Sequence, residues 1–257
     1  MLLRTDAPNS MHHGARFWTA PGSWKAWGEL DAALHGGVPH EAAWNVGRFQ
    51  YLREHPEEAR QFDLFMANFP DNRHTALAAA YDFSGASLIT DVGGGNGEAL
   101  RQILARFPKP RGLVFDRPDV VEAIGDASRL SGRIDVSGGS FLDAVPAGAD
   151  IYLLVRVLHD WSDEDCIRIL RNCRAVLAPG CRLLIVEQIL EPDPRHGRAT
   201  SYLVDTQMMA MFGSARERTK SEFDELLSAS DLSAQRLIPT TSAVWIIEVV
   251  ATKGASV

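Results

Sequence analysis

The feature that most constrains the fold is a glycine-rich turn between an apolar run and a helical segment. Glycines occupy positions 93, 94, 95 and 97, directly after the run Leu88–Val92, and Glu98–Phe107 has the apolar spacing of a helix. Glycine lets the backbone turn sharply and lets a ligand approach main-chain N–H groups at the start of a helix. The pattern predicts the first strand–turn–helix unit of a doubly wound sheet, which is the usual nucleotide crevice.

Short apolar runs alternate with amphipathic helices through residues 81–257. The clearest helix begins after Ser162, with Asp165 three residues on in a capping-box arrangement, and stops at Ala178-Pro179-Gly180. Strands that alternate with helices imply an α/β fold with a parallel sheet covered on both faces. The expected strands are Leu88–Val92, Gly112–Phe115, Ile134–Ser137, Ile151–Val157, Arg182–Gln188 and Val244–Thr252.

Residues 1–80 form a second expected domain, which is helical and rich in aromatic side chains. Trp24, Trp27, Leu30 and Leu34 fall at helical spacing, and Gly36-Gly37 ends that run. Another helix is expected to open at Pro56, a tolerated first-turn proline. It carries an apolar stripe made of Ala59, Phe62, Phe65, Met66 and Phe69. Such a stripe is most often core, and it needs a partner surface.

Charge and cysteine usage narrow the class of protein. The 257 residues contain 26 basic and 33 acidic side chains, a net charge of −7, which disfavours binding to nucleic acid or to an anionic membrane. The apolar runs are too short to span a bilayer, and the N-terminus lacks the uninterrupted apolar region of a secretory signal. The three cysteines form no C-x-x-C pair. We therefore expect a cytoplasmic protein that binds no metal.

Two acidic residues beside the turn indicate the kind of cofactor. A dinucleotide fingerprint counted from Gly93 would end at Glu98, where a carboxylate would repel a pyrophosphate. Asp91, two residues before the first glycine, instead suits a cofactor that carries an ammonium and a sulfonium group. Asp116 ends the second expected strand, the position from which a carboxylate accepts hydrogen bonds from ribose hydroxyls.

An ordered set of motifs extends over almost the whole chain. Its members are Asp91-Val-Gly-Gly-Gly-Asn-Gly97, Phe115-Asp-Arg-Pro118, Leu158-His-Asp-Trp-Ser-Asp163, Glu187, Asp205, Glu217-Arg-Thr219, Glu222-Phe223, Trp24–Leu30 and Tyr81-Asp-Phe83. Together these motifs resemble the S-adenosylmethionine-dependent O-methyltransferases of the plant caffeic-acid type and their bacterial relatives in aromatic polyketide biosynthesis. The resemblance implies a Rossmann-like, mostly parallel sheet with an antiparallel C-terminal strand, preceded by a small helical region. It also implies a small hydroxylated aromatic acceptor.

Two departures from the family pattern stand out. The family carries an N-terminal winged-helix dimerisation domain, and this sequence begins near the end of that domain. Ser140 stands where many members have an aspartate that contacts the adenine amine. A serine hydroxyl still accepts a hydrogen bond, but it offers no carboxylate.

The resemblance assigns roles residue by residue. The general base would be His159, with Glu187 and Glu217 flanking and orienting it. The residues expected at the cofactor are Asp91, Gly93, Gly95, Asp116, Ser140, Phe141 and Arg156. Those expected at the acceptor are Trp161, Asp205, Met208, Met209 and Phe212.

The proposed chemistry is physically reasonable. Proton transfer from a phenol to a histidine is uphill by about 3.5 pK units, or about 4.8 kcal/mol. A neighbouring carboxylate raises the proton affinity of the imidazole, and a nearby sulfonium favours the phenolate. A structural role stays open for some of these residues. Glu217 lies in the charge run Arg216–Lys220, which is typical of a solvated surface, and the methionines around Met208 are equally consistent with core packing.

Two other functions stay open at this point, together with the oligomeric state. The chain could bind S-adenosylmethionine without methylating, although His159 argues against this, or it could be a nicotinamide-dependent reductase, which Glu98 disfavours. The stripe in Pro56–Phe69 suits an isologous contact, so we expect a homodimer with an acceptor pocket more open than usual.

Overall fold

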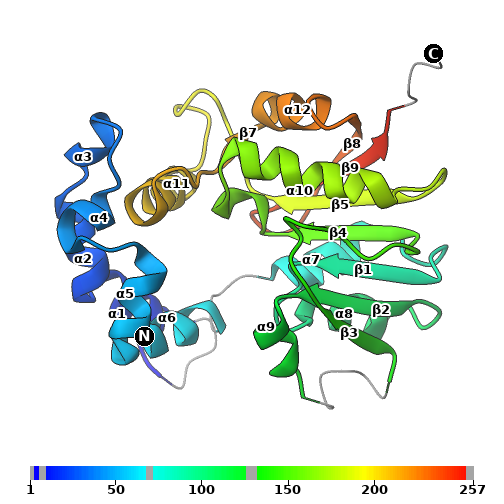
Figure 1. Ribbon diagram of the computed structural model, residues 1–257, viewed down its shortest axis with the longest axis horizontal. Coiled ribbons are helices and arrows are strands. Elements are labelled where there is room, and N and C mark those ends of the chain that lie inside the picture. Colours follow the sequence, from blue (N-terminus) through cyan, green and yellow to red (C-terminus); the bar gives the residue numbers. More distant parts are fainter. Residues whose placement is uncertain (1–2, 6–9, 68–71, 126–131, 253–257) are drawn as a thin grey trace. The chain divides into compact units, whose positions relative to one another are not determined.

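The computed structural model describes residues 3–5, 10–67, 72–125 and 132–252 (Figure 1). The chain divides into two compact units. A helical unit comprises Met1–Asp71 and Asp193–Glu217, and a sheet unit comprises Asn72–Pro192 and Arg218–Val257. This division differs from the expected boundary at residue 80, because a later segment returns to the helical unit and residues 72–80 belong to the sheet unit.

The helical unit is built from short helices, several of which begin at a proline or are flanked by a glycine. The expected helix through Trp24 and Leu34 is broken, because α2 ends at Gly28, a poor helix former, and α3 begins again at Asp31. No helix in the described part of the chain is long and apolar enough to cross a membrane. The helices are α1 (His12–Trp18), α2 (Pro21–Gly28), α3 (Asp31–Leu34), α4 (Pro39–Trp44), α5 (Arg48–Glu54), α6 (Pro56–Ala67) and α11 (Ala199–Phe212).

The apolar stripe of α6 packs against α1 within the helical unit. The helix begins at Pro56, as predicted. The rings of Phe62 and Phe65 lie 5.8 and 4.7 Å from the ring of Phe17 on α1. Phe65 is buried, whereas Met66 is exposed, and Phe69 lies outside the described residues. The stripe therefore has a partner surface within its own chain.

The sheet unit contains a seven-stranded sheet in the order β3-β2-β1-β4-β5-β9-β8 (Figure 1). The first five strands of this order are parallel to one another. Strand β9 is antiparallel to both of its neighbours, β5 and β8. The prediction of a mostly parallel sheet with an antiparallel C-terminal strand is confirmed. The strands are β1 (Leu88–Val92), β2 (Arg111–Asp116), β3 (Ile134–Gly138), β4 (Ile151–Val155), β5 (Arg182–Glu187), β8 (Leu232–Pro239) and β9 (Trp245–Ala251).

Helices cover both faces of this sheet, since alternate strand residues enter two separate cores. On one face Tyr152 and Leu154 pack with α10 (Asp163–Val176) and α12 (Lys220–Ser228). On the other, Ile151 and Leu153 pack with α7 (Arg73–Ala80), α8 (Glu98–Arg106) and α9 (Pro118–Glu122). Leu77 of α7 is fully buried in the second core, which is why residues 72–80 belong to this unit.

Two local expectations had different outcomes. Ser162 Oγ accepts a hydrogen bond from the Asp165 N–H at 3.2 Å, so the predicted N-cap of α10 is confirmed. The expected strand Ile151–Val157 is two residues too long, because Arg156 adopts a left-handed backbone with φ of 55° and ends β4 at Val155.

Candidate active site

The glycine turn sits at the carboxyl end of β1 and leads into α8. Gly93, Gly95 and Gly97 have φ of 73°, 55° and 78°, a region that side-chain-bearing residues rarely adopt. A Cβ on Gly93 would lie 2.9 Å from Val157 Cγ2 and 3.3 Å from Phe141 Cε1. Gly93 is therefore required both for its backbone conformation and for the space in front of it.

Asp116 ends β2 beside this turn. Its Oδ2 accepts the Gly95 N–H at 2.8 Å, and its Oδ1 accepts the Arg117 N–H at 2.7 Å. A carboxylate has about four lone-pair sites, so each oxygen keeps capacity for a further donor. The carboxylate is thus oriented by the loop and remains able to bind hydroxyl groups.

Asp91 is a buried carboxylate with one unpaired oxygen. Its side chain on β1 is 1% exposed, and its Oδ1 accepts no hydrogen bond from any described residue. Burial, followed by the charge of Asp116, raises the pKa of Asp91 from 3.8 to about 7. A buried acidic group of this kind would be stabilised by a cation. The residues around the turn therefore fit a cofactor that combines ribose hydroxyls with positive charge.

Aromatic side chains border the turn. The Phe141 ring meets the Trp161 ring edge to face, with centroids 5.5 Å apart and planes at 87°. Both rings are half-buried against the core beneath α10, and Ser140 is exposed next to Phe141. The structure thus places Phe141 against Gly93 and brings Trp161 to the same cluster.

His159 occupies a short 3-10 turn, η2 (Leu158–Asp160), beyond the end of β4. Its Nδ1 lies 3.4 and 3.3 Å from the two oxygens of Glu187, at the end of β5, and its Nε2 lies 3.3 Å from Asp160 Oδ1. Glu187 is fully buried and accepts the Leu158 N–H at 2.9 Å and Arg156 Nη1 at 2.8 Å. The predicted pair of His159 and Glu187 is therefore brought together.

Burial and the neighbouring charges shift the pKa values of His159 and Glu187 in opposite directions. Burial and then Arg156 would lower the pKa of His159, but the carboxylates of Glu187 and Asp160 outweigh them and raise that pKa above its ordinary value. Burial would raise the pKa of Glu187, but His159, Arg156 and the Leu158 N–H lower it. Glu187 is consequently an anion that faces the imidazole and raises its proton affinity.

Sequence reasoning missed two arginines. It assigned Arg156 to the cofactor, a role that stays a prediction, but did not foresee that Arg156 pairs with Glu187. It gave Arg218 no role. The Arg218 side chain is fully buried and donates to the carbonyls of Leu158 and Trp161. The available sequence signal was that Arg218 directly follows the predicted Glu217, and the surrounding charge run concealed it.

The remaining predicted residues belong to the helical unit. Asp205 Oδ1 accepts the N–H of Glu217 at 2.8 Å, and Glu217 is buried rather than solvated. Phe212 packs on Phe49 with ring centroids 5.2 Å apart, and Met208 and Met209 are half-buried on α11. Asp205 and Glu217 are thus adjacent, while their roles toward His159 and the acceptor stay predictions.

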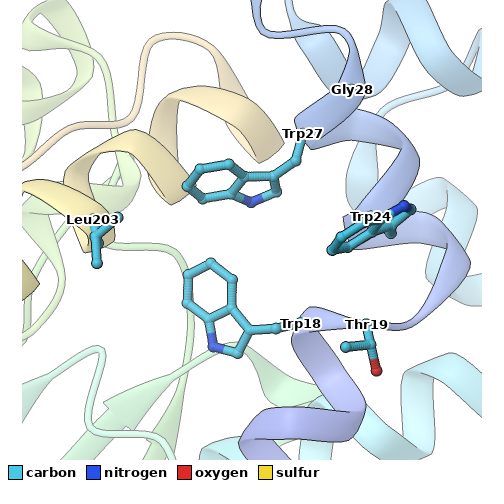
Figure 2. Close-up of a pocket in the computed structure, with 6 residues that line it drawn as sticks. All are labelled: Trp18, Thr19, Trp24, Trp27, Gly28 and Leu203. Atoms are coloured by element: carbon cyan, nitrogen blue, oxygen red, sulfur yellow. The ribbon is translucent and has the colours of Figure 1, made fainter.

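A tryptophan-lined cavity of about 560 Å³ opens in the helical unit. Figure 2 shows the indoles of Trp18 and Trp27 facing Leu203 of α11, with Trp24 across the space. Trp27 Nε1 donates to Gln207 at 2.6 Å, and Trp24 is 69% exposed. At helical spacing Leu203, Gln207 and Ala210 share one face of α11, and the predicted acceptor residues of this helix, Asp205, Met208, Met209 and Phe212, lie elsewhere on it. The lining residues are Trp18, Thr19, Trp24, Trp27, Gly28 and Leu203.

Comparison with known proteins decides the family. The model of the O-methyltransferase domain matches residues 27–232 of the chain. The chain belongs to the O-methyltransferase family. A phenazine O-methyltransferase from Lysobacter antibioticus is 36% identical over 253 residues, which are 96% of this chain and 72% of the relative.

Solved structures of this O-methyltransferase family agree. The mitomycin 7-O-methyltransferase superposes with a TM-score of 0.87 at 34% identity, over 98% of this chain and 74% of that one. An O-methyltransferase from neocarzinostatin biosynthesis, solved with S-adenosylmethionine and 2-hydroxy-5-methyl naphthoic acid, gives a TM-score of 0.78 at 30% identity, over 96% and 75% of the two chains. The cofactor of this methyltransferase is S-adenosylmethionine.

Proposed function

We propose that this methyltransferase transfers the methyl group of S-adenosylmethionine to a hydroxyl oxygen of a small aromatic acceptor, with His159 as the general base. The observation that carries the proposal is the His159–Glu187 pair. It lies at the carboxyl edge of the parallel sheet, the edge that also bears the glycine turn and Asp91. In a doubly wound fold, this edge is where ligands bind.

Residues of the sheet unit suit each part of the cofactor. Asp116 would accept the ribose hydroxyls, the turn at Gly93 would let the methionyl part approach the backbone, and Phe141 with Ser140 would border the adenine. Asp91 would supply negative charge toward the ammonium and sulfonium groups. When bound, the cofactor supplies an electrophilic methyl group on sulfur.

The proton is handled by His159. In the neutral imidazole, Glu187 accepts the Nδ1–H, and this leaves Nε2 with a lone pair for the acceptor hydroxyl proton. Transfer of that proton to Nε2 makes an imidazolium stabilised by Glu187 and Asp160. The acceptor oxygen then forms its bond to the methyl carbon as the carbon–sulfur bond breaks. Glu217 is proposed as a second carboxylate that orients the base.

The acceptor surface is proposed on α11. Asp205 offers a carboxylate, and Met208, Met209 and Phe212 offer a polarisable apolar wall suited to a flat ring. The relatives named for phenazine and mitomycin, and the one solved with 2-hydroxy-5-methyl naphthoic acid, support an aromatic acceptor.

The enzyme is further proposed to act in the cytoplasm as a homodimer. Cys166, Cys173 and Cys181 are free thiols, as is usual in a reducing compartment. The α6 stripe no longer supports pairing, because Phe17 covers it, but the exposed Trp24 and its cavity are an apolar surface that a second copy would cover. Light scattering that finds a strict monomer at high concentration would exclude the dimer.

The function is tested by mass spectrometry of products from a panel of phenols, naphthols and phenazines incubated with S-adenosylmethionine. We expect a gain of one methyl on oxygen, lost in the variant His159→Ala. Tight cofactor binding without any methylated product across the panel would favour a relative that binds the cofactor and does not methylate.

A further inference from the structure

The turn that carries His159 is too short to hold itself in place. Within η2 and its flanks, the local hydrogen bonds run from Asp160 N–H to Val157 O at 3.2 Å and from Trp161 N–H to Leu158 O at 3.3 Å. A three-residue 3-10 turn has poor hydrogen-bond geometry and little stability of its own. The position of the imidazole must therefore depend on groups outside the turn.

Arg218 lies outside this turn and is the principal group that binds the backbone carbonyls at its two ends. Its Nη1 donates to Leu158 O and its Nη2 to Trp161 O, each at 2.8 Å, so the guanidinium grips the carbonyls on both sides of His159-Asp160. Its Nε and Nη2 also donate to Asp163 Oδ1, at 3.0 and 2.7 Å. The planar fork of an arginine sets the spacing of these acceptors, whereas an ammonium group acts as a single point charge.

The two anchors of the turn are joined through the backbone. Glu187 at the end of β5 accepts the Leu158 N–H and faces His159 Nδ1. Two residues later, Ile189 in β6 (Ile189–Leu190) pairs in parallel register with Arg218 in β7 (Arg218–Thr219). Arg218 is thus held in a short two-stranded sheet whose other strand begins two residues after Glu187, the last residue of β5.

The burial of Arg218 requires an explanation beyond stability. Its side chain has no exposed area, while its ionic partner Asp163 is 49% exposed. Removal of a guanidinium from water is energetically unfavourable, and a packed apolar side chain in the same place is often no less stabilising. A buried arginine that bonds two flanking carbonyls is accounted for by the geometry that it imposes.

We propose that Arg218 is a positioning residue for the reaction, which acts by fixing the turn that carries His159. The inference rests on the proposed role of His159 as base. The imidazole lies at the limit of hydrogen-bond reach from Glu187, so a small displacement of the turn breaks that contact. The charged groups that face His159 are Glu187 from β5, Asp160 from its own turn and Arg156 from the loop after β4.

The decisive variant is Arg218→Lys, which keeps the charge and loses the fork. We expect kcat to fall roughly 10- to 100-fold, the scale for a misplacement of about 1 Å, with the dissociation constant for S-adenosylhomocysteine unchanged within about twofold. The acid limb of the pH–rate profile should move to lower pH, because His159 loses Glu187 and keeps the effects of burial and Arg156. The matched control is Arg168→Lys, whose guanidinium pairs with Asp143 on the surface of the same unit and should leave both readouts unchanged.

A titration separates failure of this inference from failure of the proposed function. The ring proton of His159, identified by its loss in His159→Gln, is followed by NMR against pH in the wild-type protein and in Arg218→Lys. A lower midpoint in the variant supports positioning even if no acceptor is methylated. An unchanged midpoint overturns it, as would an unchanged kcat and pH profile.

A second variant covers the case in which Arg218→Lys does not fold. Asp163→Asn removes the charge of the exposed partner of Arg218 and so weakens the hold of Arg218 on the turn. It should lower kcat and the pKa of His159 in the same direction as Arg218→Lys, but by less. Glu164→Gln removes a charge from the same first turn of α10 and controls for the helix terminus. Equal behaviour of the two variants would count against the proposal.

Discussion

Removal of the charge of Asp91, whose Oδ1 has no hydrogen-bond partner among the described residues, should stabilise the cofactor-free protein and weaken cofactor binding. The variant Asp91→Asn keeps the size of the side chain and removes its charge. Folding raises the pKa of Asp91 from 3.8 to about 7, so the folded state holds this proton more tightly than the unfolded chain does. The free energy of unfolding of the cofactor-free protein therefore falls by up to about 4 kcal/mol as pH rises from about 4 to about 7.

The variant Asp91→Asn has no carboxyl group at this position, so its free energy of unfolding does not fall over this pH range for this reason. Its buried amide carries its own desolvation cost, so we expect a net gain of about 1–2 kcal/mol in the unfolding free energy at pH 8. A protein of this size would then melt a few degrees higher without cofactor. At pH 5 the gain should be smaller, because the wild-type carboxyl is then mostly protonated.

Cofactor binding should respond in the other direction. Between pH 6 and pH 7 the ionised fraction of Asp91 rises from about one tenth to one half, so the affinity of the wild-type protein for S-adenosylmethionine should rise about fivefold. The asparagine variant should bind more weakly at pH 7 and show no such rise. Calorimetric titration and thermal unfolding measure the two effects on the same samples. A flat wild-type affinity over this range, or a cofactor-free variant less stable than the wild type at pH 8, would refute the reasoning.

Other perturbations address the remaining site residues. Asp116→Ala should weaken S-adenosylmethionine binding by about 1.5–3 kcal/mol in calorimetry and leave the melting temperature near that of the wild type. His159→Ala should lower turnover roughly 10²- to 10⁴-fold with nearly unchanged cofactor affinity, and full turnover would remove it as the base. Glu187→Gln should lower the pKa of His159, because burial and Arg156 then act unopposed by that carboxylate, so the acid limb of the rate profile should move to lower pH. Activity should persist in EDTA, since the described residues contain no group of three or more side chains placed to hold a metal ion.

Sequence patterns predicted the elements that are determined locally. The strand before the glycine turn, the helix after it and the cap at Ser162 follow from alternation, backbone freedom and side-chain capping within a few residues. These features also place Asp91, Asp116 and His159 at strand ends of one sheet edge. The part of the site that depends on neighbouring strands was therefore accessible from the sequence.

Contacts between residues that are far apart in the sequence could not be predicted from the sequence. The left-handed turn at Arg156 has no sequence signal, because a non-glycine residue is held there only by its surroundings. Strand β8 was missed because Leu232–Pro239 mixes polar and apolar residues and carries an irregularity between Ala234 and Arg236. Arg218 lies in a charge run that composition places in solvent, and only its distant carbonyl partners explain its burial.

The discontinuity of the helical unit limits how such a protein can diversify. The chain crosses between the units after Asp71, Pro192 and Glu217, and α11 buries Ala210 and Met211 against α2. An exchange of the N-terminal seventy residues between relatives by recombination would leave α11 facing a foreign surface. Substitutions in the core of the helical unit should therefore occur in pairs in segments 1–71 and 193–217, so that the two segments are inherited together although they are far apart in the gene.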